Sequence, residues 1–466
     1  MSVFAELQRR IEEEEIGSVD FRVTDLTGRF RHITIPASRF TERFIAEGIG
    51  FDGSNYGYRS VAGSDMILRP DLSTAYVETR NGERLLVLIA DIRDAETGRP
   101  AKIDPRGIAG AAVEYLQDQG VADDILVSPE FEFYIFEKMS YQNDRGYTGV
   151  EILAAEGNGH RAGPGLGSAI HSAYHAPLPA DRLFGLRCEI VRQIEDAGIP
   201  VKYHHHEVGT FGQQEIELGF DSLVRMADVS LIVKSIVHNT AADCGLEATF
   251  LPKPIHGEAG NGFHLHQYLV KQGTNLFSGR DALTDLARCY VGGLLTHGRS
   301  LMAWTNPSTN SYRRLVPGFE APVNLVYGAA NRSAAVRVPT YAKGEAMRIE
   351  LRTMDSTCNP YLAFAAIAMA GADGIRRGLD ARELGLGPFD TNLYGAEPGV
   401  ETDGGTLAPR SLDEALAALE QDHAFLLAGG VFSEEGIEHW IRAKQDEADA
   451  VSLRPHPYEF ALYADL

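Results

Sequence analysis

Hydrophobic positions along the first hundred residues change from helical to strand spacing. Phe4, Leu7 and Ile11 recur at helical intervals, which predicts a helix over residues 4–15. Apolar and polar residues then alternate over 19–23 and 30–34, on either side of Asp-Leu-Thr-Gly, and this pattern predicts a β-hairpin. A third strand is expected at 84–91. Because Pro105 suits a helix start, we expect a strand-rich domain over residues 1–104 and a second domain over 105–466.

The remainder of the chain alternates helical patterns with short strands. Helices are expected at 182–197, 224–246, 283–301 and 359–378. Residues 157–167 are rich in Gly, and residues 389–409 are rich in Gly, Pro and Thr, so both stretches are expected to be loops.

Four short strand patterns carry charged or imidazole side chains two residues apart. They are Pro-Glu-Phe-Glu-Phe at 129–133, Glu-Ile-Glu-Leu at 215–218, Phe-His-Leu-His at 263–266 and Arg-Ile-Glu-Leu-Arg at 348–352. In a strand, positions i and i+2 project from the same face. Glu130 and Glu132 should therefore share one face, with Phe131 and Phe133 on the other. The four patterns together predict one sheet with an apolar back and a polar front.

The carboxylates of this polar front predict a metal site. Clustered carboxylates repel one another, so a positive charge should hold them together. Several carboxylates with a single imidazole suit Mg²⁺ or Mn²⁺, whereas zinc more often binds Cys or several His. His204, His205 and His206 precede Glu207, but consecutive side chains point in different directions. We therefore expect Glu207 to be functional and the three histidines to be mostly structural.

A group of arginines indicates the reaction type. The group consists of Arg314, Arg332, Arg337, Arg348 and Arg352. Guanidinium groups bind carboxylates and phosphates through paired hydrogen bonds, and they stabilise the charge on a phosphoryl group in transfer. Surface salt bridges could account for one or two of the five. The full group favours phosphoryl transfer over a metal-dependent hydrolase that only activates water.

Composition excludes some partners. The chain has 466 residues, 44% hydrophobic content and a net charge of −22, which argues against nucleic acid or an anionic membrane surface as the main partner. Its longest apolar stretch is shorter than a membrane span, and its Glu-rich start does not resemble a signal peptide. The four cysteines are scattered, as expected of thiols in a reducing compartment. We expect a cytoplasmic protein.

A series of short motifs follows the chain in order. They are Asp52-Gly53-Ser54, Ser64-Asp65-Met66, Pro129-Glu130-Phe131-Glu132-Phe133, His205-His206-Glu207-Val208, Gly212-Gln213-Gln214-Glu215-Ile216, Lys253-Pro254, His264-Leu265-His266, Asn331-Arg332-Ser333, Arg348-Ile349-Glu350 and Asn359-Pro360-Tyr361. Residues 306–322 add Asn-Pro-Ser-Thr-Asn-Ser-Tyr-Arg-Arg-Leu-Val-Pro-Gly-Phe-Glu-Ala-Pro. This ordered series resembles the glutamine synthetase family from residue 19 to the C-terminus.

The resemblance implies a fold, a reaction and an assembly. The implied fold is α+β, with a small N-terminal β-grasp domain and a large catalytic domain whose antiparallel curved sheet, a half-barrel, is surrounded by helices. The implied reaction joins ammonia to the γ-carboxylate of glutamate through γ-glutamyl phosphate, with ATP and two or more Mg²⁺ or Mn²⁺ ions. The implied assembly is a dodecamer of two stacked rings with active sites between neighbouring subunits.

The resemblance also implies a role for each matching residue. Glu132, Glu207 and Glu215 would bind one metal, and Glu130, His264 and Glu350 the other. Arg337 and Arg348 would contact ATP phosphates, with His266 and Phe220 near the nucleotide. Arg314, Arg352 and the loop at Gly260 would bind glutamate, and Arg332 would stabilise the transferring phosphoryl group. Glu320, on a flap, would take a proton from the incoming nitrogen, while Tyr174 and a neighbouring subunit's Asp52 would form the ammonium site.

Several positions depart from the family pattern. The substrate loop, typically Asn-Gly-Ser-Gly, reads Ala259-Gly260-Asn261-Gly262; Asn55 replaces a second Ser after Ser54, Tyr268 replaces a Ser, and Glu345 replaces a Lys. Tyr394 lacks the Asp-Leu-Pro that follows an adenylylated tyrosine, so we expect an unmodified loop tyrosine. A γ-glutamyl ligase for a larger amine, such as a polyamine, ethanolamine or methylamine, remains an alternative. A non-catalytic structural or regulatory relative is disfavoured by the complete set of metal ligands.

Overall fold

The computed structural model describes residues 2–57, 64–80, 82–156, 171–280, 282–319, 321–393 and 406–466. Its N-terminal part is a five-stranded sheet in the order β2-β1-β5-β4-β3. The bounds are β1 (Ser18–Thr24), β2 (Phe30–Pro36), β3 (Ile49–Asp52), β4 (Asp65–Arg80) and β5 (Glu83–Asp94). Strands β1 and β2 pair antiparallel, which confirms the predicted hairpin, and β5 lies parallel to β1.

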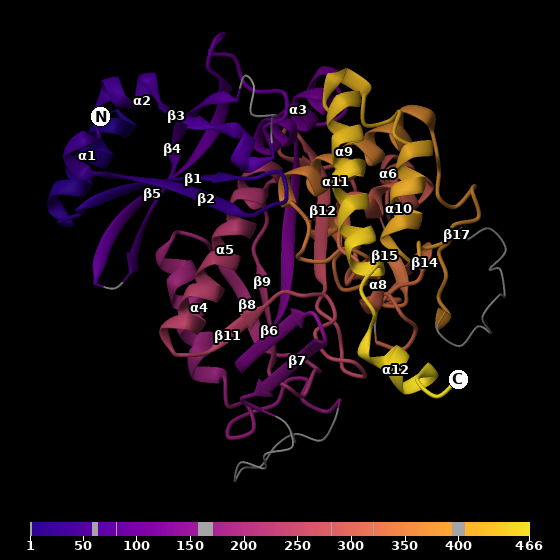
Figure 1. The fold of residues 1–466 in the computed structure, drawn as a ribbon. Helices are drawn as coiled ribbons and strands as arrows, with labels where there is room; N and C mark the ends of the chain where they lie inside the picture. Colours follow the sequence, from indigo (N-terminus) through magenta and orange to yellow (C-terminus); the bar gives the residue numbers. More distant parts are fainter. Residues whose placement is uncertain are drawn as a thin grey trace.

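Helices α1 (Val3–Glu13) and α2 (Glu42–Glu47) lie against this first sheet (Figure 1). Alternating side chains of β1 and β5 are buried beneath them, including Val19, Phe21, Leu86 and Leu88, together with Leu7 of α1. The predicted N-terminal helix is therefore present, and its apolar side completes a small separate core.

The larger part of the chain begins with α3 (Pro105–Asp118), directly after Asp104. Its main sheet follows the order β17-β14-β15-β16-β12-β6-β9-β8, and it pairs antiparallel except between β14 and β15. The bounds are β6 (Asp124–Asp144), β8 (Val201–His206), β9 (Gln213–Leu218), β12 (Phe263–Lys271), β14 (Asn324–Ala329), β15 (Ala334–Val338), β16 (Ile349–Leu351) and β17 (Thr406–Leu407). Short strands β7 (Tyr147–Ala154), β10 (Asp221–Ser222), β11 (Glu247–Thr249) and β13 (Thr274–Asn275) attach to it.

One face of the main sheet is packed with apolar side chains, as the strand patterns predict. Phe131, Ile216 and Leu265 come from three neighbouring strands and are fully buried. Helices α5 (Leu223–Asp243) and α9 (Pro360–Arg377) pack against the sheet (Figure 1), and the ring of Phe364 stacks 6.0 Å from that of Phe263. Since this back is closed by helices, the polar side chains of the same strands must face the other way.

The remaining helices include one that confirms the helix expected over 182–197 and several at positions where no helix was predicted. Helix α4 is Phe184–Asp196, α8 is Ser311–Arg314, α10 is Leu412–Gln421, α11 is Glu434–Ser452 and α12 is Pro457–Tyr463. The helix expected over 283–301 is instead two helices, α6 (Asp285–Thr296) and α7 (Gly298–Thr305), so that prediction is wrong. His297 sits between them, and its ring contacts Asp373 and Asp422 at 3.0 and 2.8 Å. The loop expected at 157–167 lies outside the described residues.

Arg106 joins the two parts of the molecule. From α3 it donates hydrogen bonds to Asp71 of β4 at 2.8 Å and to Asp91 of β5 at 2.6 Å. It also donates to Asp228 of α5 at 2.9 Å, and Asp228 is almost fully buried. The expected domain limit at residues 104 and 105 stays a prediction, and it lies two residues from this junction. Among the described residues, no helix is long and apolar enough to cross a membrane.

Candidate active site

The pairing of strands aligns polar side chains in rows across the front of the main sheet. One row contains His264 of β12, Glu130 of β6, and Glu217 and Tyr203 of β9 and β8; the next contains Glu132, Glu215 and His205. Directly opposed residues in antiparallel strands have Cβ atoms only about 5 Å apart. Residues separated by more than a hundred positions in the sequence are therefore neighbours.

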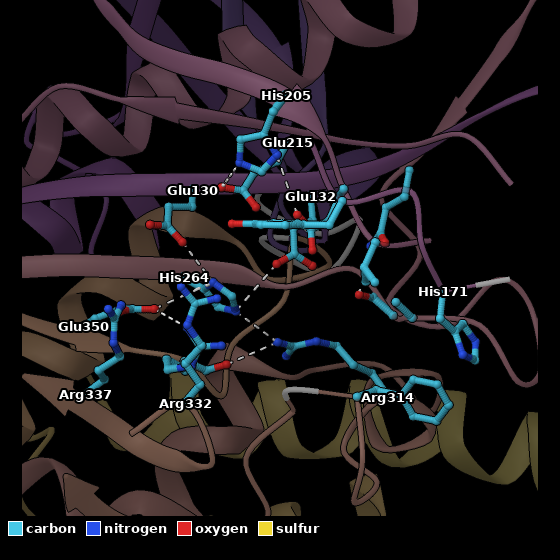
Figure 2. A pocket seen from close by; sticks show the side chains of 18 of the residues that line it. Glu130, Glu132, His171, His205, Glu215, His264, Arg314, Arg332, Arg337 and Glu350 are labelled. Atoms are coloured by element: carbon cyan, nitrogen blue, oxygen red, sulfur yellow. Dashed lines mark hydrogen bonds and ion pairs between the residues drawn. The ribbon is translucent and has the colours of Figure 1, made fainter. Parts of the chain in front are cut away.

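These rows form one wall of a cavity of about 740 Å³. All six expected metal ligands line it: Glu130, Glu132, Glu207, Glu215, His264 and Glu350. Arg314, Arg332, Arg337, Arg352, Tyr174 and Gly260 line it too. Figure 2 shows Glu130, Glu132 and Glu215 on one side of His264, with Arg314, Arg332 and Arg337 on the other. The cavity thus joins an acidic group to a basic one.

The first acidic group gathers around Glu207 and Glu215. Ligand atoms of His205, Glu207 and Glu215 lie within 4.8 Å of one another, and His205 Nε2 is 3.3 Å from Glu215 Oε1. Burial raises the pKa of Glu207 well above its usual value, and the charges of Glu215 and Glu132 add to this shift. Burial likewise raises the pKa of Glu215. A divalent cation with a preference for oxygen ligands fits this group, because it would balance the repulsion.

The second acidic group gathers around Glu130. Glu130 Oε2 lies 2.9 Å from His264 Nδ1, and Glu130 Oε1 lies 2.7 Å from His266 Nε2. Burial alone would raise the pKa of Glu130, but the two imidazoles outweigh burial and hold this pKa well below its usual value. His264 Nδ1 is also 3.8 Å from Glu350 Oε1, and ligand atoms of Glu130, His266 and Glu350 lie within 4.8 Å of one another. This group also has the donor set of a divalent cation site.

The arginines are held in place by the sheet. Arg337 and Arg352 both donate to Glu350, with Arg337 Nη1 at 2.5 Å. Arg314 donates to the backbone carbonyls of residues 352, 353 and 354, and its Nη2 lies 3.3 Å from His264 Nε2. Arg332 interacts with Tyr174, whose pKa is raised by burial. Contacts within the chain therefore position the basic wall.

Two glycines of the loop 259–262 allow this close packing. A Cβ at Gly260 would lie 2.7 Å from Arg314 Cγ, and a Cβ at Gly262 would lie 2.6 Å from His264 Nε2 and 2.7 Å from Arg314 Nη2. Asn261 is fully buried, and its amide donates to the carbonyl of Leu251 at 2.9 Å. Asn261, which departs from the family pattern, therefore has a structural role: its hydrogen bond to Leu251 holds the loop in place.

Three expected nucleotide contacts do not line the cavity. His266 is fully buried beneath Glu130. The guanidinium of Arg348 lies 5.7 Å over the ring of Phe220, and it donates to the Tyr341 hydroxyl at 3.4 Å. Tyr341 lines the cavity, so Arg348 and Phe220 lie behind this part of its edge.

One expected catalytic residue, Asp52, does not line the cavity. It is exposed on β3, and its Oδ1 accepts hydrogen bonds from Ser54, which lower the pKa of Asp52. Asn55 donates to the second oxygen of Asp52 at 2.8 Å. Glu320 and Tyr394 lie outside the described residues, so their expected roles stay predictions.

The structure adds residues that the sequence argument did not single out. The three imidazoles of 204–206 diverge as expected: His204 accepts from Arg187, and His206 is buried against Glu156. His205, however, lines the cavity between Glu207 and Glu215. Lys202 and Tyr203 line it as well. The signal was present, since residues 203 and 205 share a face with period two, but the strand beside them was not known.

Comparison with known proteins agrees with this geometry. Residues 15–95 match the glutamine synthetase β-grasp domain, which confirms the expected N-terminal fold, and residues 102–463 match the glutamine synthetase catalytic domain. Glutamine synthetase of Aquifex aeolicus (strain VF5) is 43% identical over 462 residues, 98% of this chain and 97% of that protein. Glutamine synthetase of Frankia alni is 43% identical over 470 residues, 98% of each. The cryo-EM structure of Plasmodium falciparum glutamine synthetase superimposes with a TM-score of 0.89 at 29% identity, covering 99% of both chains. The chain therefore belongs to the glutamine synthetase family.

Proposed function

We propose that this protein joins ammonia to the γ-carboxylate of glutamate, using ATP and forming glutamine, ADP and phosphate. The observation that carries the proposal is one cavity lined by six candidate metal ligands and by Arg314, Arg332, Arg337 and Arg352. A carboxylate is a poor acyl donor because its leaving group would be oxide. Phosphorylation by ATP supplies a better leaving group, and this step requires positive charge around the transferring phosphoryl group.

The proposed metal ligands form two sets. Glu132, Glu207 and Glu215 would bind one divalent ion, and Glu130, His264 and Glu350 the other. Because most of these ligand atoms are carboxylate oxygens, we propose Mg²⁺ or Mn²⁺ as the bound ions. When bound, the ions would neutralise phosphate oxygens during transfer. His205 and His266 adjoin the two sets, at 3.3 Å from Glu215 and 2.7 Å from Glu130.

The arginines divide between the substrates in this proposal. Arg314 and Arg352 would bind the carboxylates of glutamate, beside the Gly260 loop that packs on Arg314. Arg337 and Arg348 would contact ATP phosphates, with His266 and Phe220 nearby. Arg332 is exposed, and we propose that it stabilises the phosphoryl group in transfer.

The amine step needs a residue from outside this chain. Ammonium is not nucleophilic, so a carboxylate must attract it and remove a proton. Asp52 is exposed on β3 and is not part of its own chain's cavity, which supports a role in a neighbouring subunit's site beside Tyr174. Glu320, on a flap, would take a further proton from the incoming nitrogen after its attack. We accordingly propose a homo-oligomer, a dodecamer with sites between subunits, in the cytoplasm.

A panel of amines tests the proposed reaction. Phosphate release would be measured with glutamate, ATP and Mg²⁺ or Mn²⁺, and with ammonia, methylamine, ethanolamine or a polyamine as the amine. The expected result is release with ammonia that depends on glutamate and is lost in the Glu215→Gln variant. If phosphate release is faster with a larger amine, that amine and not ammonia is the substrate. An absence of turnover with every amine, or hydrolysis without ATP, would refute the ligase assignment.

A further inference from the structure

Lys202 carries a positive charge on the otherwise acidic strand wall of the cavity. Its side chain projects from β8, lines the cavity and is 38% exposed. Its Nζ lies 2.5 Å from Glu217 Oε1 on β9 and 4.9 Å from the centre of the Tyr203 ring. Glu217 is fully buried. The pair therefore consists of a cation that reaches the cavity and a carboxylate that reaches no solvent.

The burial of Glu217 explains why Lys202 is held in one place. A buried carboxylate without a paired cation is strongly destabilising, so Glu217 anchors the ammonium group of Lys202. An ammonium group donates three hydrogen bonds, and the bond to Glu217 uses one of them. The cavity side of the ammonium can therefore bind an anion while its anchor is kept.

The neighbours of Glu217 indicate which anion this would be. Glu217 is the direct strand partner of Glu130, and its Oε1 lies 3.8 Å from His266 Nε2. His266 is in turn 2.7 Å from Glu130. A divalent ion bound at Glu130 would attract phosphate oxygens to this row of the sheet. The nucleotide phosphates of the proposed reaction would thus lie next to Glu217 and its lysine.

We infer that Lys202 binds a phosphate oxygen of the nucleotide, and that Glu217 is the positioning residue that holds its ammonium group. The inference rests on the proposed function for the identity of the anion. It adds a charged contact to ATP from β8. The expected contacts, Arg337 and Arg348, are not on this strand.

The variants Lys202→Met and Glu217→Gln test the two roles. Loss of one hydrogen bond to a charged group weakens binding by about tenfold or more, so Lys202→Met should raise the KM for ATP and the Kd for ADP by that factor. The KM for glutamate should change less than about twofold, and Lys202→Arg should recover most of the loss. A rise in the KM for glutamate alone would overturn the inference.

The double variant Lys202→Met/Glu217→Gln separates nucleotide binding from a purely structural pair. Lys202→Met alone leaves a buried charge, so its thermal midpoint should fall, and removal of that charge in the double variant should restore the midpoint. The inference requires the Kd for ADP to remain raised in the double variant. Recovery of the Kd together with the midpoint would show that Lys202 only neutralises Glu217. Lys271→Met, which removes a lysine paired with the Gly120 carbonyl, should change neither value.

Calorimetric titration with ADP and Mg²⁺ keeps this test independent of turnover. A wild-type protein that binds ADP but forms no glutamine would refute the proposed reaction, while the ADP titrations would still decide the role of Lys202. A wild-type protein that forms glutamine, with equal Kd values for ADP in wild type and Lys202→Met, would refute only the role of Lys202.

Discussion

At the scale of single residues, two glutamates of the candidate active site, Glu207 and Glu215, are largely buried close to each other. The carboxyl groups of Glu207 and Glu215 have raised pKa values, first because they are buried and then because they face each other and further glutamates. A metal ion binds the deprotonated carboxylate, so binding must displace the protons that these groups retain. The affinity for metal should therefore depend on pH.

We expect the affinity for Mn²⁺ to rise as the pH rises above the usual range of a carboxyl group, with proton release on binding. The direction follows from the raised pKa values, because the protonated form dominates below them and competes with the metal. Calorimetric titration in buffers of different ionisation enthalpy measures the released protons. Glu215→Gln should reduce the release, and an affinity that does not change with pH would contradict the prediction.

Gly262 makes a second prediction at this scale. Gly262→Ala would place a methyl group 2.7 Å from Arg314 Nη2 and 2.6 Å from His264 Nε2. Because displacement of a catalytic group by about 1 Å can reduce rates about 100-fold, we expect kcat/KM for glutamate to fall by up to that factor. Gly110→Ala on α3 is the matched control, since no atom lies within 4 Å of its Cβ position. Equal activity in the two variants would argue against the close packing.

From the alternation pattern, the sequence predicted which face of a strand a residue occupies, but it did not predict which residues of a neighbouring strand lie beside it. Alternation separates Glu130 and Glu132 from the buried Phe131 and Phe133 without knowledge of any partner. The role of His205 depends on Glu215, its partner across β8 and β9, and no local pattern reveals that pairing. Glu320 and Tyr394 remain predictions from the resemblance.

At the scale of elements, the sequence predicted a helix well where the residues that cap its ends are next to it in the sequence. Helix α9 begins after Asn359, whose side chain accepts from the backbone N–H of Tyr361, and ends at Gly378 in the left-handed conformation. His297, which separates α6 and α7, instead contacts Asp373 and Asp422, which are far away in the sequence. Because the helical periodicity of the sequence continues across that break, it predicted a single helix.

The N-cap of α3 provides a test of pH dependence. Asp104 accepts from the backbone N–H groups of Ile92 and Arg106 at 3.0 and 3.2 Å, and its burial raises its pKa to about 7. The folded protein then binds a proton more tightly than the unfolded chain between about pH 4 and pH 7. This contribution to stability is present at the lower pH and is lost as the pH rises through the folded pKa.

We therefore expect wild type to lose free energy of unfolding relative to Asp104→Asn as the pH rises from about 4 to about 7. The slope of the difference should be up to about 1.4 kcal/mol per pH unit. Urea unfolding of both proteins at several pH values measures it. If the two curves differ only by a constant offset, that offset comes from the changed hydrogen bonds, and Asp104 does not titrate in this range.

At the scale of the whole molecule, Arg106 is the charged link between the two parts. It pairs with Asp71, Asp91 and the buried Asp228, which also accepts from the Tyr361 hydroxyl at 2.5 Å. Arg106→Ala should reduce the free energy of unfolding by about 3–5 kcal/mol, because it leaves Asp228 buried without its cation. Arg442→Ala, at an exposed ion pair with Glu438, should change stability by less than about 1 kcal/mol. Denaturant unfolding compares them.

The assembly makes a prediction that a single chain cannot satisfy. If Asp52 serves a neighbouring subunit's cavity, Asp52→Ala and Glu215→Gln are each inactive in a pure oligomer. After denaturation and joint refolding in equal amounts, roughly one quarter of the sites should combine two intact halves, since neighbours mix independently in a ring. Glutamine formation by the mixture measures this recovery. A mixture as inactive as its components would place Asp52 outside the neighbouring site.

The alternation of faces along β6 also constrains how such a chain can change. Deleting one residue between Glu130 and Glu132 would turn every later side chain of the strand over, bringing an aromatic ring into the cavity and a carboxylate into the hydrocarbon interior. Replacement of a side chain alters only one position on one face. The length of these strands is therefore under tighter constraint than their composition, and new specificities in this scaffold should arise by substitution or in the loops.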